Sequence, residues 1–566
     1  MRRDNDRPEE SAADAAVPLD MLLTSAARGQ WQRFVPGRAG LRFIRALARK
    51  PQAVAGRSEE LARELAAIAI GRSHLAPDTK DRRFADPAWM SNWALRAILQ
   101  CYLAVGHAVT DVADQAELDW RDAEKMRFII DNLINALAPS NNPVLNPLTW
   151  KAMIDTGGAS AAHGVLNLVR DLARKPRVPT MVDVSGFRLG NNIAATDGAV
   201  VLRTPVFELI QYKPTTEEIG TIPLLIVPPL INKFYVVDLA PGRSLIEYLV
   251  SRGQHVFAVS WRNPGMEQRD WGLDTYGQAV IDALIAIENV TNSRRVHTLS
   301  LCSSGALTSM VAAHLTDTRD EDRIASCNLA VSVLDQSNAG LTSALADHRA
   351  AKIATAASAA KGYLEGSALA EMFAWMRPND LIWSYWVNNY LQGRKPAAFD
   401  VLFWNADTTR MAAALHRDFV ELFLANQLGH PGSATMLGTP IDLTTVKADS
   451  YIVAGIADHI SRWQSCYRSV ALLGGDTRFV LSTSGHVACI VNPPTNPKAT
   501  FRTNEARPED PQEWIASAHA TKGSWWPDFA DWLAERNGGT VRAPSTLGSS
   551  AHTPTDKGPG TYVFEK

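Results

Sequence analysis

Cysteine is scarce in this chain, and the few cysteines lie far apart. The 566 residues contain five, at positions Cys101, Cys302, Cys327, Cys466 and Cys489. None belongs to a CxxC motif, and none stands beside a histidine at the spacing of a zinc site. The sequence therefore predicts neither a disulfide framework nor a metal site. One cysteine could then serve as a catalytic nucleophile, and packing is the expected role of the others.

The chain also lacks a long apolar segment and a strong charge of either sign. No apolar run is as long as a membrane span requires, and the first ten residues, MRRDNDRPEE, are too polar for a secretory signal. The formal net charge is only −2, which argues against binding to nucleic acid through charge. We therefore expect a cytoplasmic globular protein with no membrane span and no nucleic-acid partner.

Composition and periodicity divide the chain into regions. Residues 1–20 are rich in charged residues, proline and alanine, which predicts a disordered N-terminus. Residues 21–185 have apolar residues at three- and four-residue spacing, which predicts a helical N-terminal domain. A catalytic domain is predicted for residues 186–537. Residues 538–566 are rich in Gly, Pro, Ser and Thr and are expected to form a flexible tail.

Strands and helices alternate within the predicted catalytic domain. Residues 223–227 and 255–260 are apolar throughout, as strands buried on both faces of a parallel sheet are. A helical stretch at 244–251 lies between them, and this order predicts a doubly wound α/β domain. Further strands are expected at 198–202, 207–212, 450–454 and 478–481, with another ending at Cys302, and a further helix at 276–287.

The alternation stops between about residues 335 and 440, where helical patterns replace it. A helical insertion at this point would form a lid over the active site. The alternative is an ordinary packed subdomain. The insertion is rich in aromatic residues, namely Phe373, Trp375, Trp383, Tyr385, Trp386, Tyr390, Phe399, Phe403 and Trp404.

Residues 296–307 read VHTLSLCSSGAL, a short apolar run that breaks at a cluster of small residues around Cys302. A helical pattern follows, and this order is typical of a nucleophile elbow. The tight turn needs small residues two places before and after the nucleophile, which are Ser300 and Ser304 here. Glycine is usual at both, and serine tolerates unusual backbone angles less well, so the sequence leaves open how the two serines affect the strain of the turn. The alternative is a buried structural cysteine.

Asp458 and His486 follow Cys302 in the order nucleophile, acid and histidine that α/β-hydrolase sheets use. Each comes just after a predicted strand, where catalytic loops emerge. The pattern predicts Cys302 as nucleophile, Asp458 as acid and His486 as general base. Two alternatives stay open: Asp458 caps a helix that starts near Ser461, and His459 replaces His486.

An oxyanion hole is expected beside the nucleophile. One donor would be the backbone N–H of Ser303, directly after Cys302. The second should come from the loop after an early strand, residues 228–233. Pro228 and Pro229 have no N–H, so Ile231 is the candidate.

Several longer motifs resemble those of polyhydroxyalkanoate synthases. They are PPLINKFYVVDL at 228–239, VSWRNP at 259–264, GIADHI at 455–460, SGHV at 484–487, NPP at 492–494 and SWWP at 524–527. The pseudomonad-type enzymes, which typically polymerise medium-chain units, are similar at WMRPNDLIW (375–383), YWVNNY (385–390) and PGTYV (559–563). The elbow departs from the family's usual GxCxGG, because this chain has SLCSSG at 300–305.

The resemblance implies an α/β-hydrolase fold with a helical insertion, and (R)-3-hydroxyacyl-CoA as the substrate. Cys302 would take the acyl group and release CoA, and the 3-hydroxyl of another unit would then form the ester. In the family, the aspartate matching Asp458 is associated with activating that hydroxyl, and orienting His486 is the alternative. No cofactor is expected, since CoA is part of substrate and product. The expected partners are the nascent polyester granule, at whose surface the protein would lie in the cytoplasm, and a second copy in a homodimer.

Two rival functions remain. A thioesterase or polyester depolymerase would share the fold, although serine is the commoner nucleophile in those enzymes. A granule-associated paralogue impaired by its altered elbow would have no activity, although the chain retains Cys302, Asp458 and His486.

Overall fold

The computed structural model describes residues 26, 34–336, 341–458 and 460–566. The predicted disordered N-terminus, residues 1–20, lies outside these ranges, and so does His459, the rival of His486.

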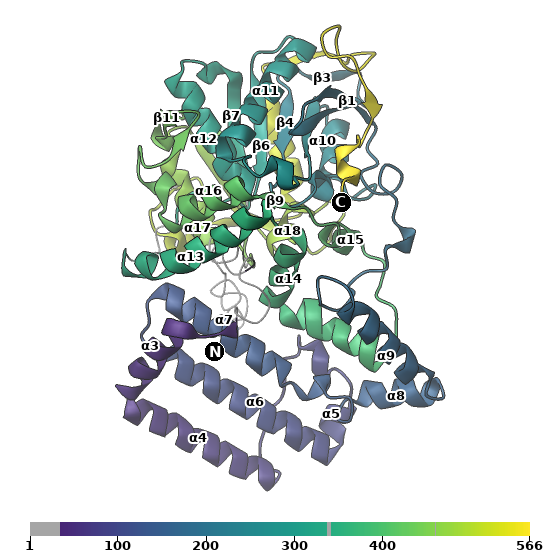
Figure 1. The fold of residues 1–566 in the computed structure, drawn as a ribbon, viewed down its shortest axis with the longest axis vertical. Helices are drawn as coiled ribbons and strands as arrows, with labels where there is room; N and C mark the ends of the chain where they lie inside the picture. Colours follow the sequence, from purple (N-terminus) through teal and green to yellow (C-terminus); the bar gives the residue numbers. More distant parts are fainter. Residues whose placement is uncertain (1–25, 27–33, 337–340, 459) are drawn as a thin grey trace.

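An eleven-stranded sheet forms the centre of the α/β domain, which is the upper part of the molecule in Figure 1. Six neighbouring strands, β5, β4, β6, β7, β12 and β13, run parallel, and antiparallel strands extend both edges. In spatial order the strands are β15 (His519–Lys522), β14 (Thr500–Thr503), β13 (Thr477–Ser482), β12 (Ser450–Gly455), β7 (Ile324–Ala330), β6 (Val296–Leu301), β4 (Leu224–Val227), β5 (Val256–Trp261), β2 (Phe207–Tyr212), β1 (Gly198–Arg203) and β17 (Asp556–Lys557).

Helices cover both faces of this sheet. They are α10 (Leu245–Ser251), α11 (Leu273–Thr291), α12 (Ser303–Asp317), α17 (Trp463–Arg468), α18 (His486–Ile490), α19 (Pro511–Ser517) and α20 (Trp525–Arg536). Leu225 and Val227 of β4 belong to one core with α11 and α12, whereas Leu224 and Ile226 belong to the other with α10 and α20. Burial on both faces is why these strands are apolar throughout.

The predicted α/β domain is confirmed. Each strand expected from the sequence is present, and so are the two expected helices, α10 and α11. The sequence pattern missed β7, which lies between β6 and β12 in the sheet, and the antiparallel strands β14 and β15.

The segment between β7 and β12 is mainly helical, as predicted. It contains α13 (Leu341–Lys361), α14 (Gly366–Met376), the π-helices η8 (Asn379–Trp383) and η9 (Trp386–Leu391), α15 (Asp400–Ala406), α16 (Ala413–Leu424) and η10 (Gln427–Gly429). Two short antiparallel strand pairs belong to it as well, β8 (Tyr363–Leu364) with β9 (Met411–Ala412) and β10 (Thr435–Met436) with β11 (Thr439–Pro440). Trp375, Trp383, Trp386 and Tyr390 form a chain of edge-to-face rings, with successive centroids 6.5, 5.9 and 5.3 Å apart.

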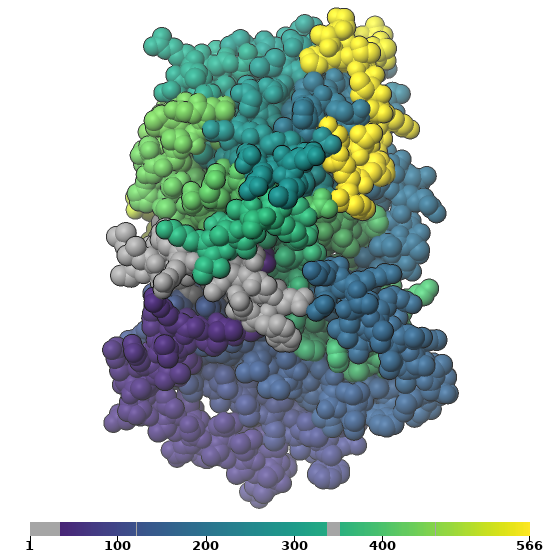
Figure 2. Space-filling view, viewed as in Figure 1, coloured from purple at the N-terminus to yellow at the C-terminus, as the bar shows by residue number. Residues whose placement is uncertain are grey.

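The N-terminal helices form a layer at one end of the molecule, purple to blue in Figures 1 and 2. They are α3 (Gly37–Ala48), α4 (Pro51–Ala69), α5 (Ala88–Ser91), α6 (Trp93–Asp114), α7 (Trp120–Ala136), α8 (Pro147–Asp155) and α9 (Ala159–Leu172). Every helix in the described ranges is too short or too polar to cross a membrane.

This layer packs against the aromatic rings of the insertion. The Trp386 indole N–H donates to the Asn141 carbonyl at 3.1 Å, and the Tyr390 hydroxyl donates to Asp171 at 2.7 Å. A Cβ at Gly164 of α9 would lie 1.9 Å from the Tyr390 carbonyl oxygen, so only glycine permits this approach. Most of the aromatic chain is therefore part of the interface with the N-terminal helices.

The expectation of a flexible tail at residues 538–566 is wrong. Strand β16 (Thr540–Arg542) pairs with β3 (Glu218–Gly220), and β17 pairs with β1 at the edge of the main sheet. The chain then makes a 3₁₀ turn, η13 (Tyr562–Phe564), with Val563 buried. The segment lies on the α/β domain, yellow in Figure 2. Its glycines and prolines form turns between docked pieces, which composition alone does not distinguish from a loose loop.

Candidate active site

Cys302 lies at the apex of a sharp turn between β6, which ends at Leu301, and α12, which begins at Ser303. Its backbone has φ 53° and ψ −118°, a conformation that non-glycine residues rarely adopt. The Cys302 N–H donates to the Ala330 carbonyl at 2.9 Å, and the Ser332 hydroxyl donates to the Cys302 carbonyl at 2.9 Å. The strand, turn and helix of a nucleophile elbow are thus present.

The positive φ of this turn falls on Cys302 itself, and neither Ser300 nor Ser304 has one. The two serines therefore add no backbone strain to the turn, since their backbones adopt ordinary conformations. The glycine that the elbow does require is Gly305. A Cβ there would lie 2.3 Å from Ser332 Oγ, in a position that nothing larger can share.

The two serine hydroxyls are used within the turn. Ser300 Oγ donates to Thr308 Oγ1 at 2.7 Å. Ser304 Oγ accepts the Leu301 N–H at 2.9 Å and lies 2.7 Å from the Val227 carbonyl oxygen. Both serines are fully buried, so these bonds satisfy groups that water does not reach.

His486 and Asp458 come from the loops after β13 and β12. His486 is the first residue of α18, and its Nδ1 lies 2.7 Å from Asp458 Oδ2. The other oxygen of Asp458 accepts the N–H groups of Ile460 and Ser461 at 2.8 and 2.9 Å. Asp458 thus orients the histidine and also caps the turn before α17, so the capping alternative coexists with the triad.

The charges around His486 set its protonation. Burial alone lowers its pKa, but the negative charges of Asp458 and of a Cys302 thiolate outweigh burial and raise the pKa well above 6.5. A hydrogen bond between the His486 ring and Cys302 adds to this effect. The structure therefore brings together all three residues that the sequence singled out.

Three of the other cysteines are buried and unsuited to react as thiolates. Burial raises the pKa of Cys327 to about 11 and raises those of Cys466 and Cys489 further above the usual range. Cys101 is half-buried in α6 of the N-terminal layer. Cys302 is the one cysteine of the described residues that pairs with a histidine and an acid.

The backbone around Cys302 offers two unused donors. The Leu230 N–H donates to Ser303 Oγ at 3.1 Å and is therefore occupied. The N–H groups of Ile231 and Ser303, the two predicted oxyanion donors, have no acceptor among the described residues. The Ile231 carbonyl is held by the Thr409 hydroxyl at 2.7 Å.

A cavity of about 230 Å³ opens at this site. Its wall is mainly apolar and consists of Pro229, Ile231, Asn232, Val236, Cys302, Phe373, Arg377, Leu381, Val401, Leu402, Trp404, Asn405, Ile460, Gly485, His486, Val487, Ala488 and Ile490. Only Phe373 and Trp404 of the aromatic residues expected in a lid line it. Arg377 and Asn405 were not predicted, because nothing in their sequence context shows which face of the insertion meets the elbow.

Comparison with known families finds two overlapping matches, one that begins in the N-terminal helices and one within the α/β domain. Residues 80–249 match the family described as Poly-beta-hydroxybutyrate polymerase (PhaC) N-terminus. Residues 223–493 match the alpha/beta hydrolase fold, which agrees with the parallel sheet and confirms the predicted fold class.

Three curated relatives extend over nearly the whole chain. Poly(3-hydroxyalkanoate) polymerase 1 of Ectopseudomonas oleovorans is 44% identical, covering 92% of this chain and 93% of its own. Polymerase 2 of the same organism is 43% identical, covering 89% and 90%. The polymerase subunit PhaC of Cupriavidus necator is 38% identical, covering 88% and 86%. Because the identity runs through both the N-terminal layer and the α/β domain, the chain belongs to the poly(3-hydroxyalkanoate) polymerase family.

Proposed function

We propose that this chain is an acyltransferase that moves (R)-3-hydroxyacyl groups from CoA thioesters to a growing polyester through an acyl-Cys302 intermediate. One observation carries the proposal: the strained Cys302 faces the Asp458–His486 pair on an apolar cavity, in a chain of the polymerase family. No cofactor takes part, since CoA enters with the substrate and leaves as product.

In the first step Cys302 Sγ attacks the thioester carbonyl carbon. His486 takes the thiol proton, the new Sγ–C bond forms, and the bond to the CoA sulfur breaks. The proton then passes from His486 to the departing CoA sulfur. The N–H groups of Ile231 and Ser303 stabilise the negative charge on the carbonyl oxygen. One thioester replaces another, so the step is close to balanced in energy.

In the second step the 3-hydroxyl of another unit attacks the acyl-Cys302. His486 accepts the hydroxyl proton and returns it to the cysteine sulfur as the ester forms. Asp458 has both oxygens engaged, one with His486 and one with two backbone N–H groups. This arrangement favours the role of orienting His486 over direct activation of the hydroxyl.

Water has to be kept from the acyl-enzyme, because hydrolysis would end the chain. The insertion supplies the apolar side chains of Phe373, Leu381 and Trp404 to the mainly apolar cavity wall. We therefore assign it the role of a lid, and the cavity's apolar lining suits the alkyl side chains of medium-chain units.

Replacing Cys302 tests the reaction directly. With (R)-3-hydroxyacyl-CoA of several chain lengths, we expect CoA release together with polymer, and an acyl adduct on the Cys302 peptide by mass spectrometry. Cys302→Ala should lower CoA release at least about 10⁴-fold, as loss of a catalytic nucleophile does. Cys101→Ala, in the N-terminal layer, is the matched control and should keep its activity.

The products of the same assay separate the rivals. Free 3-hydroxy acid in place of polymer would show a thioesterase or depolymerase. No CoA release at any chain length would show an impaired paralogue.

Asp458→Asn tests the acid. The asparagine retains an oxygen for the Ile460 and Ser461 N–H groups but removes the charge that raises the pKa of His486. We expect the pKa of His486 to fall, measured by NMR of ¹⁵N-labelled histidine, and kcat to fall about 10²–10⁴-fold with little change in folding. An unchanged kcat would contradict the assignment.

Ser304→Gly tests whether the elbow is impaired by its serines. Glycine would remove the acceptor of the buried Leu301 N–H, so we expect the free energy of unfolding to fall by about 1–3 kcal/mol. No gain in kcat is expected, since Ser304 has no positive φ. A large rise in kcat would show instead that the serine strains the turn.

The N-terminal layer is proposed to contact the polyester granule. Exposed apolar side chains gather on α8 and α9, namely Trp150, Ile154, Val165, Leu166, Val169 and Leu172. An exposed apolar face of this kind marks an interaction site, and the product of the proposed reaction is an apolar polymer. Granule attachment at this face would place the enzyme on its own product. A second copy of the chain, in a homodimer, is the alternative occupant.

The double variant Leu166→Gln/Val169→Gln tests this face. We expect a several-fold smaller bound fraction on co-sedimentation with poly(3-hydroxyalkanoate) particles, with CoA release unchanged. Val541→Gln changes an exposed apolar residue of β16 and is the matched control. Normal particle binding with a changed sedimentation coefficient would assign the face to the homodimer instead.

A further inference from the structure

The end of the segment 555–566 reaches the loop that carries Ile231, although more than three hundred residues separate them in the sequence. Lys233, two residues after Ile231, is only 5% exposed. Its ammonium group donates to the Val563 carbonyl. The proposed mechanism assigns no role to this buried contact between Lys233 and Val563.

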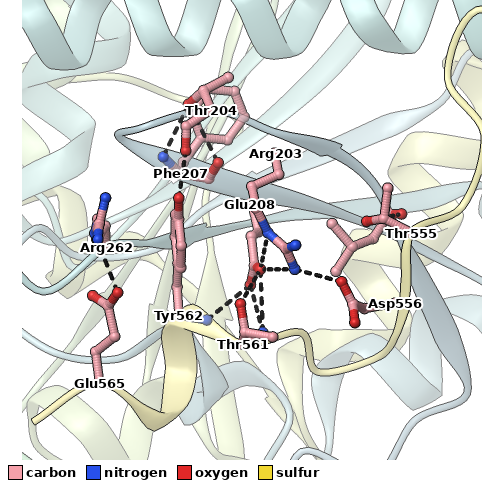
Figure 3. Close-up of polar contacts among 11 residues, drawn as sticks. Arg203, Thr204, Phe207, Glu208, Arg262, Thr555, Asp556, Thr561, Tyr562 and Glu565 are labelled. Carbon is pink, nitrogen blue, oxygen red and sulfur yellow. Dashed lines mark hydrogen bonds and ion pairs between the residues drawn. The ribbon is translucent and has the colours of Figure 1, made fainter.

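The sheet fixes the position of this segment. Glu208 of β2 is fully buried and accepts hydrogen bonds from three donor groups of the segment: the Thr561 N–H at 2.9 Å, the Thr561 hydroxyl at 2.7 Å and the Tyr562 N–H at 3.0 Å. Arg203 of β1 binds both Glu208 and Asp556 (Figure 3). Undocking the segment would leave the buried Glu208 carboxylate without these donors, which costs free energy, and the segment is therefore firmly held.

The same segment adds an exposed lysine, Lys566, to the buried ion pair of Lys233 and Asp407 beside the loop. Asp407, at the end of α15, lies 3.0 Å from the Lys233 ammonium and also binds Lys566. The Tyr235 hydroxyl donates to its second oxygen at 2.9 Å. Without the segment, Lys233 would lose the Val563 carbonyl and Asp407 would lose one of its two cations.

The insertion holds the loop at its backbone. The Thr409 hydroxyl donates to the Ile231 carbonyl, and the Trp404 indole N–H donates to the Lys233 carbonyl at 2.8 Å. The segment holds the loop by the Lys233 side chain. Ile231 therefore lies in a stretch that is anchored from two directions, and a displacement of about 1 Å in such a group costs about 10²-fold in rate.

We propose that residues 561–566 form a strap that positions the Ile231 N–H for the oxyanion, with Lys233 as the positioning residue on the loop. The inference rests on the proposed function, because Ile231 is a donor only in that reaction. The oxyanion exists only in the transition state and the tetrahedral intermediate. The strap therefore acts on kcat and leaves KM nearly unchanged.

The test compares CoA release by the full chain, by a chain ending at Gly560, and by Lys233→Met and Lys233→Arg. We expect kcat to fall about 10–10²-fold in the shortened chain and in Lys233→Met, with KM within about twofold. Lys233→Arg should recover most of the activity, since a guanidinium can bind both the Val563 carbonyl and Asp407. A synthetic peptide of residues 561–566 in excess should raise the kcat of the shortened chain. Lys557→Gln changes an exposed side chain of β17, on the same segment but outside the strap, and is the matched control that should behave as the full chain.

Absence of CoA release by the full chain would contradict the proposed function and not the strap alone. A folded shortened chain with unchanged kcat would overturn the strap, and so would a rise in KM at constant kcat. If the shortened chain does not fold, the comparison of Lys233→Met with Lys233→Arg decides whether the strap positions the loop. Equal kcat in Lys233→Met and Lys233→Arg, measured on protein with full-chain circular dichroism, would overturn the proposal.

Discussion

The candidate active site depends on one strained residue, Cys302, whose left-handed backbone costs about 1–3 kcal/mol and persists only where the surroundings impose it. Here the neighbouring strand supplies that restraint. Ala330, at the end of β7, accepts the Cys302 N–H, and Ser332 binds the Cys302 carbonyl. Gly305 leaves the space in which Ser332 approaches. The packing of β6 against β7 therefore holds Cys302 at the cavity wall, and the parallel register of these strands is part of the geometry of the candidate site.

The same register explains why the triad could be predicted from the sequence and the strand β7 could not. Cys302, Asp458 and His486 follow strands whose carboxyl ends lie at one edge of the sheet, so chain order and strand ends sufficed. Strand β7 contains Ser326 and Asn328, which read as polar loop residues. Both are fully buried, and their partners, His297 of β6 and the Tyr451 N–H of β12, are identified only once the sheet has formed.

Contacts between distant parts of the chain account for the other differences. The aromatic residues of the insertion mark it as a packed element, but composition does not say that Trp386 and Tyr390 meet the N-terminal helices and that Phe373 and Trp404 meet the cavity. The Gly, Pro, Ser and Thr content of residues 538–566 fits a loose tail as well as it fits the docked segment that the structure shows. What docks them is Glu208, a fully buried carboxylate on the mainly apolar strand β2.

The serines of the elbow show how a departure from a family pattern is accommodated. The usual glycines leave space and add no bond, whereas Ser304 links the elbow to the Val227 carbonyl at the end of β4. Ser303, the residue before Ser304, makes a second contact, because its hydroxyl accepts the Leu230 N–H. Both bonds join the nucleophile's turn to the loop that carries Ile231. The elbow and the proposed oxyanion donor are thereby held as one unit, so the substitution of glycine by serine adds rigidity at the point where the two halves of the site meet.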